Sequence, residues 1–270
     1  MIIIGEKING AIPSVAKAIR ERDEKFIQTL AAQQASAGAD YIDCCASVEQ
    51  DEPETLRWMI DCIQAVTDKP ICIDSPSPQV LAQAIDFCQR PGLINSVSGE
   101  GEKIRILFPL LAQPEYSGWQ VVALLSGSRG IPKNADDRLQ VFQQIMQEAK
   151  AYGIAPHRIH IDPLVEMLCT SENGIETNTQ VIRSIREAYP TIHITAAVSN
   201  ISFNLPARKL LNMGFVVLAM NAGLDCAILD PTNRDLLGII YAAQALLGED
   251  DYCMEYIGAY RRGQIGPVSK

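Results

Sequence analysis

The chain has 270 residues, of which 47% are hydrophobic and 20% charged, and its formal net charge is −9. These proportions argue against a disordered chain, and the length fits one large α/β barrel or two small domains. The acidic balance argues against a nucleic-acid partner, because such a partner requires a basic patch on the protein.

One pattern repeats along the chain. A short apolar run ends at a polar residue, and a loop and a helical stretch follow. The runs do not alternate between apolar and polar residues, as expected for strands that are buried on both faces of a parallel sheet. Eight such runs are present: Ile2–Ile4, Tyr41–Ile42, Ile71–Ile73, Leu93–Ile94, Val121–Leu125, Ile159–Ile161, Ile192–Val198 and Ala227–Leu229.

Helix start and stop signals stand between these runs. Asp23 is placed to cap a helix that ends before Gly38, and Pro53 opens a second helix. Ser77 and Pro78 form a cap followed by proline at the first helical position. Further helices are predicted over residues 102–112, 135–152, 176–188, 206–222 and 234–247.

Strands that alternate with helices eight times predict a (β/α)8 TIM barrel. The rival is an open doubly wound sheet, whose first strand–helix turn often carries G-x-G-x-x-G. Residues 5–10 read GEKING, which does not match, and no Walker-type loop occurs. No low-complexity linker divides the chain. We therefore predict a single (β/α)8 barrel domain over residues 1–270.

Two further features concern the cellular location. No apolar run approaches the ~20 residues of a spanning helix, and the first residues lack the basic and apolar regions of a signal peptide. The eight cysteines include no C-x-x-C motif, which favours reduced thiols. We therefore expect a cytoplasmic protein with no membrane partner.

Active sites of (β/α)8 barrels lie at the carboxyl ends of the strands. The residues that follow the apolar runs here are mostly carboxylates and amides. Single residues of this kind often cap the next helix, but five or more at the same end of a barrel favour a polar binding site. The set comprises Glu6, Asn9, Asp43, Asp74, Asn95, Ser126, Asp162, Ser199, Asn200 and Asp230.

Several reaction classes lack the side chains that they need. A Schiff-base enzyme requires a desolvated lysine at a strand end, and Lys7 is the only candidate. His157, His160 and His193 stand at the starts of strands, at the opposite end of the barrel. A zinc or two-metal hydrolase and a Ser-His-Asp triad are therefore disfavoured, and we expect no metal site in this chain.

The hydrogen-bond donors and acceptors at the mouth of the barrel restrict the chemical class of the ligand. A carboxylate accepts two parallel N–H groups, and an asparagine side chain both donates and accepts. A 2-amino-4-oxo-pyrimidine edge, as in guanine or a pterin, presents such groups. Asp74 and Asp162 match its donors, and Asn95 matches a donor and an acceptor together. From chemistry alone, the ligand is a polar planar heterocycle.

Seven short motifs stand in register along the barrel: GEKING at 5–10, DS at 74–75, INS at 94–96, GIPK at 130–133, IDPL at 161–164, SNIS at 199–202 and AGLD at 222–225. Together they resemble the methyltetrahydrofolate:corrinoid protein methyltransferases, relatives of the pterin-binding domain of cobalamin-dependent methionine synthase. The resemblance runs nearly end to end. It implies a barrel that is usually a homodimer, with tetrahydrofolate or methyltetrahydrofolate as substrate and a corrinoid protein as partner.

The resemblance also implies roles for individual residues. Asp74, Asn95 and Asp162 hold the pterin edge, in agreement with the donor and acceptor pattern. Asn200 lies near pterin N5 as the catalytic residue, and Ser199 shapes the same loop.

The resemblance also bears on two positions after the seventh strand. Arg208 matches an arginine of the family, which either organises that loop or contacts the benzoate end of the substrate. Phe203 occupies a position where the best-known members have glutamine. This departure from the family pattern affects one polar contact and the arrangement of Arg208.

The implied reaction moves a methyl group between N5 of the folate and Co(I) of the corrinoid. Asn200 donates a hydrogen bond to N5 in the transition state, and donors of this type contribute ~3 kcal/mol. An amide cannot supply a proton, so the N5 proton comes from water through a network that includes Asp162 or Asp43. No D-x-H-x-x-G corrinoid motif occurs in the chain, so the corrinoid arrives on another protein.

Two alternatives stay open. A dihydropteroate synthase uses a similar pterin grip, but it also needs a lysine near strand seven and an Arg-x-His after strand eight to bind diphosphate. The chain has Ser199-Asn200 and Asp230-Pro231-Thr232 at those places. A non-catalytic folate-binding barrel would keep the pterin-binding residues but lack the donor to N5. The presence of Asn200 disfavours this alternative.

Overall fold

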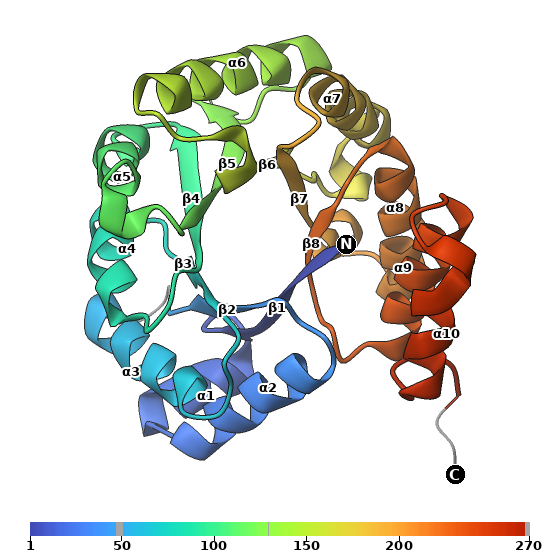
Figure 1. Ribbon diagram of the computed structural model, residues 1–270, viewed down its shortest axis with the longest axis horizontal. Coiled ribbons are helices and arrows are strands. Elements are labelled where there is room, and N and C mark those ends of the chain that lie inside the picture. The colour runs from blue at the N-terminus through green and yellow to red at the C-terminus, as the bar shows by residue number, and fades with distance from the viewer. Residues whose placement is uncertain (47–50, 129, 268–270) are drawn as a thin grey trace.

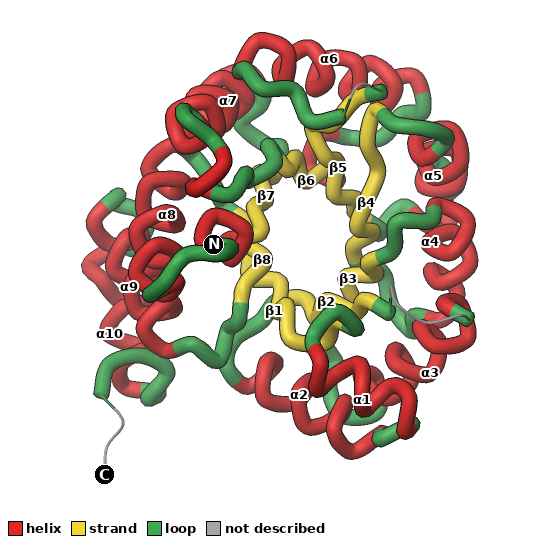
Figure 2. The backbone as a smooth tube through the Cα atoms, turned by 180° about the vertical axis from the view of Figure 1, so that it is seen from behind, coloured by secondary structure: helices red, strands yellow, loops and turns green. Residues whose placement is uncertain are grey.

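The computed structural model describes residues 1–46, 51–128 and 130–267. Eight parallel strands of the described residues pair in chain order, and β1 (Ile2–Asn9) pairs with β8 (Cys226–Leu229) to close a barrel. Helices surround this barrel on the outside (Figures 1 and 2). The predicted single-domain (β/α)8 fold is confirmed. The other strands are β2 (Tyr41–Cys45), β3 (Ile71–Asp74), β4 (Leu93–Gly99), β5 (Gln120–Gly127), β6 (Ile159–Asp162) and β7 (His193–Ala197).

The predicted helix caps form as expected. The Asp23 carboxylate accepts a hydrogen bond from the Phe26 amide at 3.0 Å, and Ser77 Oγ accepts one from the Val80 amide at 3.3 Å. The α-helices are α1 (Pro13–Glu21), α2 (Glu24–Ser36), α3 (Glu52–Gln64), α4 (Pro78–Ala84), α5 (Lys103–Leu111), α6 (Ala135–Ala151), α7 (Gly174–Ala188), α8 (Arg208–Ala222), α9 (Arg234–Leu246) and α10 (Met254–Arg261). Short 3-10 helices are η1 (Ile85–Phe87), η2 (Pro114–Tyr116), η3 (Pro156–Arg158), η4 (Leu168–Thr170), η5 (Val198–Ser202) and η6 (Asp251–Cys253).

Several elements differ from the sequence expectation, and strands β2, β4 and β5 all extend past their predicted apolar runs. The first strand continues beyond its apolar run to Asn9, with a register shift between Gly5 and Ile8. Helix α1 was not predicted, although a proline stands at its start and its buried residues Val15, Ala18 and Ile19 follow helical spacing. Helix α10 was not predicted either, because Ala259 is its one buried residue and the apolar face that identifies a surface helix is missing.

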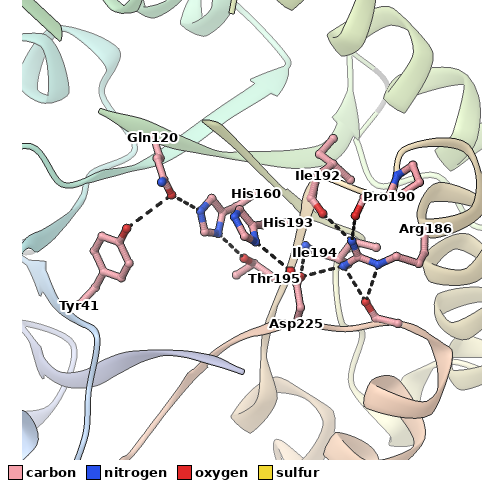
Figure 3. A network of polar contacts seen from close by, with 11 residues as sticks. Tyr41, Gln120, His160, Arg186, Pro190, Ile192, His193, Ile194, Thr195 and Asp225 are labelled. Carbon is pink, nitrogen blue, oxygen red and sulfur yellow. Dashed lines mark hydrogen bonds and ion pairs between the residues drawn. The ribbon is translucent and has the colours of Figure 1, made fainter. Parts of the chain in front are cut away.

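His160 and His193 lie at the amino ends of β6 and β7, as predicted (Figure 3), and His157 lies in η3 just before β6. The buried ring of His160 stacks on that of His193, with 4.6 Å between centroids, and contacts Gln120 Oε1 at 2.6 Å. His193 Nδ1 lies 2.8 Å from a carboxylate oxygen of Asp225. Burial, aided by the neighbouring His193, lowers the pKa of His160 to about 3. This imidazole therefore stays neutral and packs the end of the barrel opposite the predicted site.

The barrel interior and the layer between strands and helices form the apolar core. Ile4, Cys72, Leu93, Val122 and Cys226 form a cluster of their own that also includes Ile228. Within the described ranges, no helix is both long and apolar enough to cross a bilayer. Because the barrel interior is packed with apolar side chains, the polar groups at the carboxyl ends of the strands stand on a rigid frame.

Candidate active site at the carboxyl ends of the strands

A cavity of about 510 Å³ lies at the carboxyl ends of the strands. This volume falls within the range of small-molecule sites. Its aliphatic lining comes from Ala11, Ile12, Ala197 and Ile228. The remaining lining residues are Glu6, Lys7, Asn9, Asp43, Asp74, Asn95, Ser199, Asn200, Phe203, Arg208 and Asp230.

Asp43, Asp74 and Asn95 stand on three neighbouring strands at one side of this cavity. Asp74 pairs in register with Asn95, and Asn95 also forms a hydrogen bond with the Asp43 carboxylate. Burial raises the pKa of Asp74 to about 6. Burial and the negative charge of Asp74 raise the pKa of Asp43 well above its usual range. Both carboxyl groups therefore hold a proton more tightly than an exposed aspartic acid does.

Asp43 has a further property that matters for ligand binding. Its side chain is buried, and its Oδ1 atom has no hydrogen-bond partner within the described residues. A buried polar atom without a partner is costly, so this oxygen favours a ligand that presents a hydrogen-bonding group to it. Sequence reasoning placed Asp43 at the mouth but assigned it no binding role.

Asp162 stands apart from the cavity lining. It is the last residue of β6 and is 7% exposed, and its Oδ1 accepts a hydrogen bond from the Leu164 amide at 2.7 Å. Burial raises its pKa to about 6, against the effects of that hydrogen bond and of the Arg138 charge. The structure thus brings Asp74 and Asn95 to the cavity but leaves the third predicted pterin ligand outside its lining.

The loop that carries Asp162 is held by a buried arginine. Arg138 of α6 is fully buried and donates hydrogen bonds to the carbonyl oxygens of Pro132 at 3.0 Å and Leu164 at 2.9 Å. It also forms an ion pair with Glu166 at 2.6 Å. One side chain therefore joins the loop after β5 to the loop after β6, and with it the GIPK and IDPL motifs.

Replacing Arg138 with methionine is expected to lower the free energy of unfolding by about 3–5 kcal/mol, because it leaves the Glu166 carboxylate and several carbonyl groups without their donor. Chemical denaturation monitored by circular dichroism measures this change. Glu166→Gln is the matched control, with an expected cost near 1 kcal/mol because Glu166 is partly exposed and the guanidinium keeps its carbonyl partners. Equal denaturation midpoints for Arg138→Met and wild type would refute the role.

A second arginine shapes the turn after β7. Arg208 donates hydrogen bonds to the Ser199 carbonyl oxygen at 2.8 Å and to Ser202 Oγ at 3.0 Å. Its guanidinium carbon lies 4.7 Å from the centre of the Phe203 ring. Of the two roles considered for Arg208, these contacts favour organisation of the loop. Phe203 supports the arginine by stacking, in place of the polar contact that a glutamine would make.

Glu6 of β1 contacts the same turn. Its Oε2 accepts a hydrogen bond from Ser199 Oγ at 3.2 Å, and burial raises its pKa to about 6. The adjacent Lys7 pairs with Asp230 at 3.2 Å, which argues against a Schiff-base lysine. From the sequence, Glu6 is placed at the mouth of the barrel without a binding role. The strand has a register shift between Gly5 and Ile8, and such a shift changes the direction of nearby side chains. An apolar run in the sequence does not indicate where a shift of this kind occurs.

Comparison with known proteins identifies the family of the chain. The family model described as pterin binding enzyme matches residues 13–230. The chain belongs to the pterin-binding enzymes. It is 49% identical over 269 residues to the methylcorrinoid:tetrahydrofolate methyltransferase of Eubacterium limosum, with 99% of each chain covered. It is 28% identical over 255 residues to methionine synthase of Mycobacterium tuberculosis, with 87% of this chain and 21% of that protein covered.

Solved structures share the fold of this pterin-binding enzyme. The dihydropteroate synthase of Yersinia pestis superposes with a TM-score of 0.66 at 15% sequence identity, covering 92% of this chain and 93% of that chain. At this identity the similarity concerns the fold. Choosing among the reactions of pterin-binding enzymes therefore depends on the side chains of the cavity.

Proposed function

We propose that this pterin-binding enzyme transfers a methyl group between N5 of tetrahydrofolate and the cobalt of a corrinoid that a partner protein carries. One observation carries the proposal: Asn200, a neutral hydrogen-bond donor, lines the same cavity as Asp74 and Asn95. The Eubacterium limosum relative, whose name states a methylcorrinoid:tetrahydrofolate methyltransferase, supports it. The corrinoid is a substrate delivered by another chain, and the proposal requires no metal bound to this one.

Each residue then has a defined task. The Asp74 carboxylate accepts the pterin 2-amino and ring N–H groups, and Asn95 pairs with a neighbouring donor and acceptor. Asn200 donates a hydrogen bond to N5, while Arg208 and Ser199 hold the turn that carries it. Asp162 stays a predicted ligand of the pterin, although its Oδ1 is already bound to the Leu164 amide.

A dihydropteroate synthase reaction fits the cavity less well. A diphosphate leaving group needs cations at the reacting end of the substrate. At the reacting end, the turn after β7 carries the neutral residues Ser199 and Asn200. The Lys7 ammonium is paired with Asp230. Arg208 already donates to backbone and hydroxyl oxygens of the turn. The cavity is therefore better suited to a substrate whose reacting end carries no phosphate.

The homodimer and the cytoplasmic location both stay predictions. Exposed apolar side chains gather on the last helices: Leu246 is 87% exposed and Met254 61% exposed. Tyr256 and Tyr260 border an apolar hollow of about 680 Å³ beside α8 and α9. Apolar surface of this kind favours contact with another protein surface, and we place the dimer interface there.

Folate binding is expected to weaken in acid. The pterin N–H groups need an ionised Asp74 carboxylate, and the pKa of this group is about 6. Protonation below pH 6 removes an acceptor, so affinity falls up to tenfold for each further pH unit, and we expect a dissociation constant about tenfold larger at pH 5 than at pH 7.5. Calorimetric titration of tetrahydrofolate under anaerobic conditions measures the change. A dissociation constant that stays constant over this range would contradict the assignment.

A spectroscopic assay tests the reaction itself. The purified protein is mixed with tetrahydrofolate and methylcobalamin in the absence of oxygen, and the visible spectrum is followed. We expect loss of the methylcobalamin band and growth of the Co(I) band only when both protein and folate are present. The reverse mixture, methyltetrahydrofolate with Co(I) cobalamin, is expected to give the opposite change. If neither mixture reacts and tetrahydrofolate also fails to bind in calorimetry, the proposal is wrong.

A further inference from the structure

The proposed reaction changes the number of protons on N5, and this inference rests on that reaction. Tetrahydrofolate carries a hydrogen on N5 that methyltetrahydrofolate lacks, so one proton leaves N5 when the methyl group arrives and returns when it departs. Asn200 is a neutral amide and cannot take up this proton at ordinary pH. Some other group near N5 must hold it.

Glu6 is placed to hold this proton. Its carboxylate reaches the cavity from β1 and accepts a hydrogen bond from Ser199 Oγ at 3.2 Å. Ser199 directly precedes Asn200 in the 3-10 helix η5, so the hydroxyl group and the amide lie on the same turn. Hydrogen bonds from Arg208 to Ser199 and Ser202 fix that turn. The contact therefore links the carboxylate to the residue next to the N5 donor.

The other carboxyl groups of the site are less suited to this role. Asp74 is engaged by the pterin edge in the proposed complex. Asp162 lies outside the cavity lining, with Oδ1 bound to the Leu164 amide. Asp43 is buried beside Asp74, and burial together with the negative charge of Asp74 raises its pKa well above the usual range, which disfavours release of its proton. Asp230 forms an ion pair with Lys7.

We propose that Glu6 holds the N5 proton and exchanges it with the substrate through the hydroxyl group of Ser199. When tetrahydrofolate is methylated, the N5 lone pair forms the new N–C bond, the cobalt–carbon bond breaks, and its electron pair stays on cobalt as Co(I). The N5 proton passes to Ser199 Oγ, and the hydroxyl proton of Ser199 passes to the Glu6 carboxylate. In the demethylation of methyltetrahydrofolate the same transfers run backwards, and Glu6 supplies the proton.

The surroundings of Glu6 suit an exchangeable proton. Burial and the negative charge of Asp230 raise its pKa. The hydrogen bond from Ser199 and the positive charges of Lys7 and Arg208 lower it, and the net pKa is about 6. The Asp43 carboxyl is a further acidic neighbour of Glu6, and burial and the charge of Asp74 raise its own pKa well above the usual range. A pKa near the working pH is the most effective for a group that both accepts and donates. Methylation of tetrahydrofolate should therefore accelerate as the pH rises through about 6, and demethylation should slow.

The test compares Glu6→Gln with the wild type in single-turnover methylation of saturating tetrahydrofolate by methylcobalamin, from pH 5 to pH 8. We expect the rate at pH 7.5 to fall by about 100-fold, within the range for a lost proton-transfer group, and the rise near pH 6 to disappear. The dissociation constant of tetrahydrofolate should change by less than about threefold, because Glu6 does not contact the pterin edge. Glu187→Gln, an exposed position at the carboxyl end of α7, is the matched control and should behave as wild type.

Two further variants separate proton exchange from a structural role. Glu6→Asp keeps a carboxyl group and should retain the pH-dependent rise at a reduced rate. Ser199→Ala removes the relaying hydroxyl and should flatten the profile as Glu6→Gln does. The inference is overturned if Glu6→Gln transfers methyl within twofold of wild type, or if it is slower but keeps the rise near pH 6. If the wild type itself transfers no methyl group, the proposed function fails, and this inference fails with it.

Discussion

Replacing Asp74 with asparagine is expected to abolish measurable folate binding and, at the same time, to stabilise the protein. The amide matches the carboxylate in shape but offers one acceptor in place of two and turns a donor toward a pterin N–H group. Hydrogen bonds to a charged group contribute ~1.5–3 kcal/mol each, so the loss of two predicts an affinity at least about 100-fold lower. Calorimetric titration of tetrahydrofolate into Asp74→Asn measures this loss. An unchanged isotherm would show that Asp74 does not bind the pterin.

The stabilisation follows from the pKa of Asp74. Burial raises this pKa from 3.8 to about 6, so the folded protein binds the proton more tightly than the unfolded chain. The ionised form therefore destabilises the fold above pH 6, and this cost disappears as the pH falls toward 3.8. At ~1.4 kcal/mol per pKa unit, the cost at neutral pH is about 3 kcal/mol, of which the asparagine variant recovers a part.

Thermal unfolding checks the sign of this effect. With a shift of about 2–4 °C per kcal/mol for a chain of this size, Asp74→Asn should melt about 3 °C or more above wild type at pH 7.5. The difference should shrink at pH 5, where Asp74 is largely protonated. Asp61→Asn on the exposed face of α3 is the control, with no expected change. A lower melting temperature for Asp74→Asn at both pH values would show that the carboxylate stabilises the fold.

Asn200→Ala is expected to slow methyl transfer by about 100-fold while lowering folate affinity by only about fivefold. Loss of one donor that acts on charge developing in the transition state costs ~3 kcal/mol, whereas a neutral hydrogen bond in the ground state contributes ~1 kcal/mol. Single-turnover rates with saturating corrinoid, paired with calorimetry of tetrahydrofolate, separate the two. A transfer rate within twofold of wild type would show that Asn200 does not act on N5.

The barrel could be predicted from the sequence because its signals are local. Each strand contains a largely apolar run, and Ser77 marks the start of α4 because its Oγ accepts a hydrogen bond from the Val80 amide. The rule that active sites lie at the carboxyl ends of the strands then places Asp74, Asn95 and Asn200 near one another without any coordinates. These three do line one cavity.

The rest of the site depends on contacts between residues that are distant in the chain. Arg138 meets Leu164 and Glu166 across two loops, and Arg208 stacks on Phe203 after a turn whose path the sequence does not specify. Asp162 follows its strand as regularly as Asp74 does, yet a backbone amide two residues later takes up one of its oxygens. Sequence spacing identifies which side chains reach the mouth of the barrel, and tertiary contacts decide which of them face the cavity.

The most direct test of the account is a crystal structure of the protein with bound methyltetrahydrofolate. We expect the pteridine ring in the cavity at the carboxyl ends of the strands. The Asp74 carboxylate should lie within hydrogen-bond distance of the 2-amino and ring N–H groups, and the Asn200 amide nitrogen should lie roughly 3 Å from N5. A folate bound elsewhere on the surface, or a pteridine whose N5 points away from Asn200 and Ser199, would contradict the proposed reaction at this site.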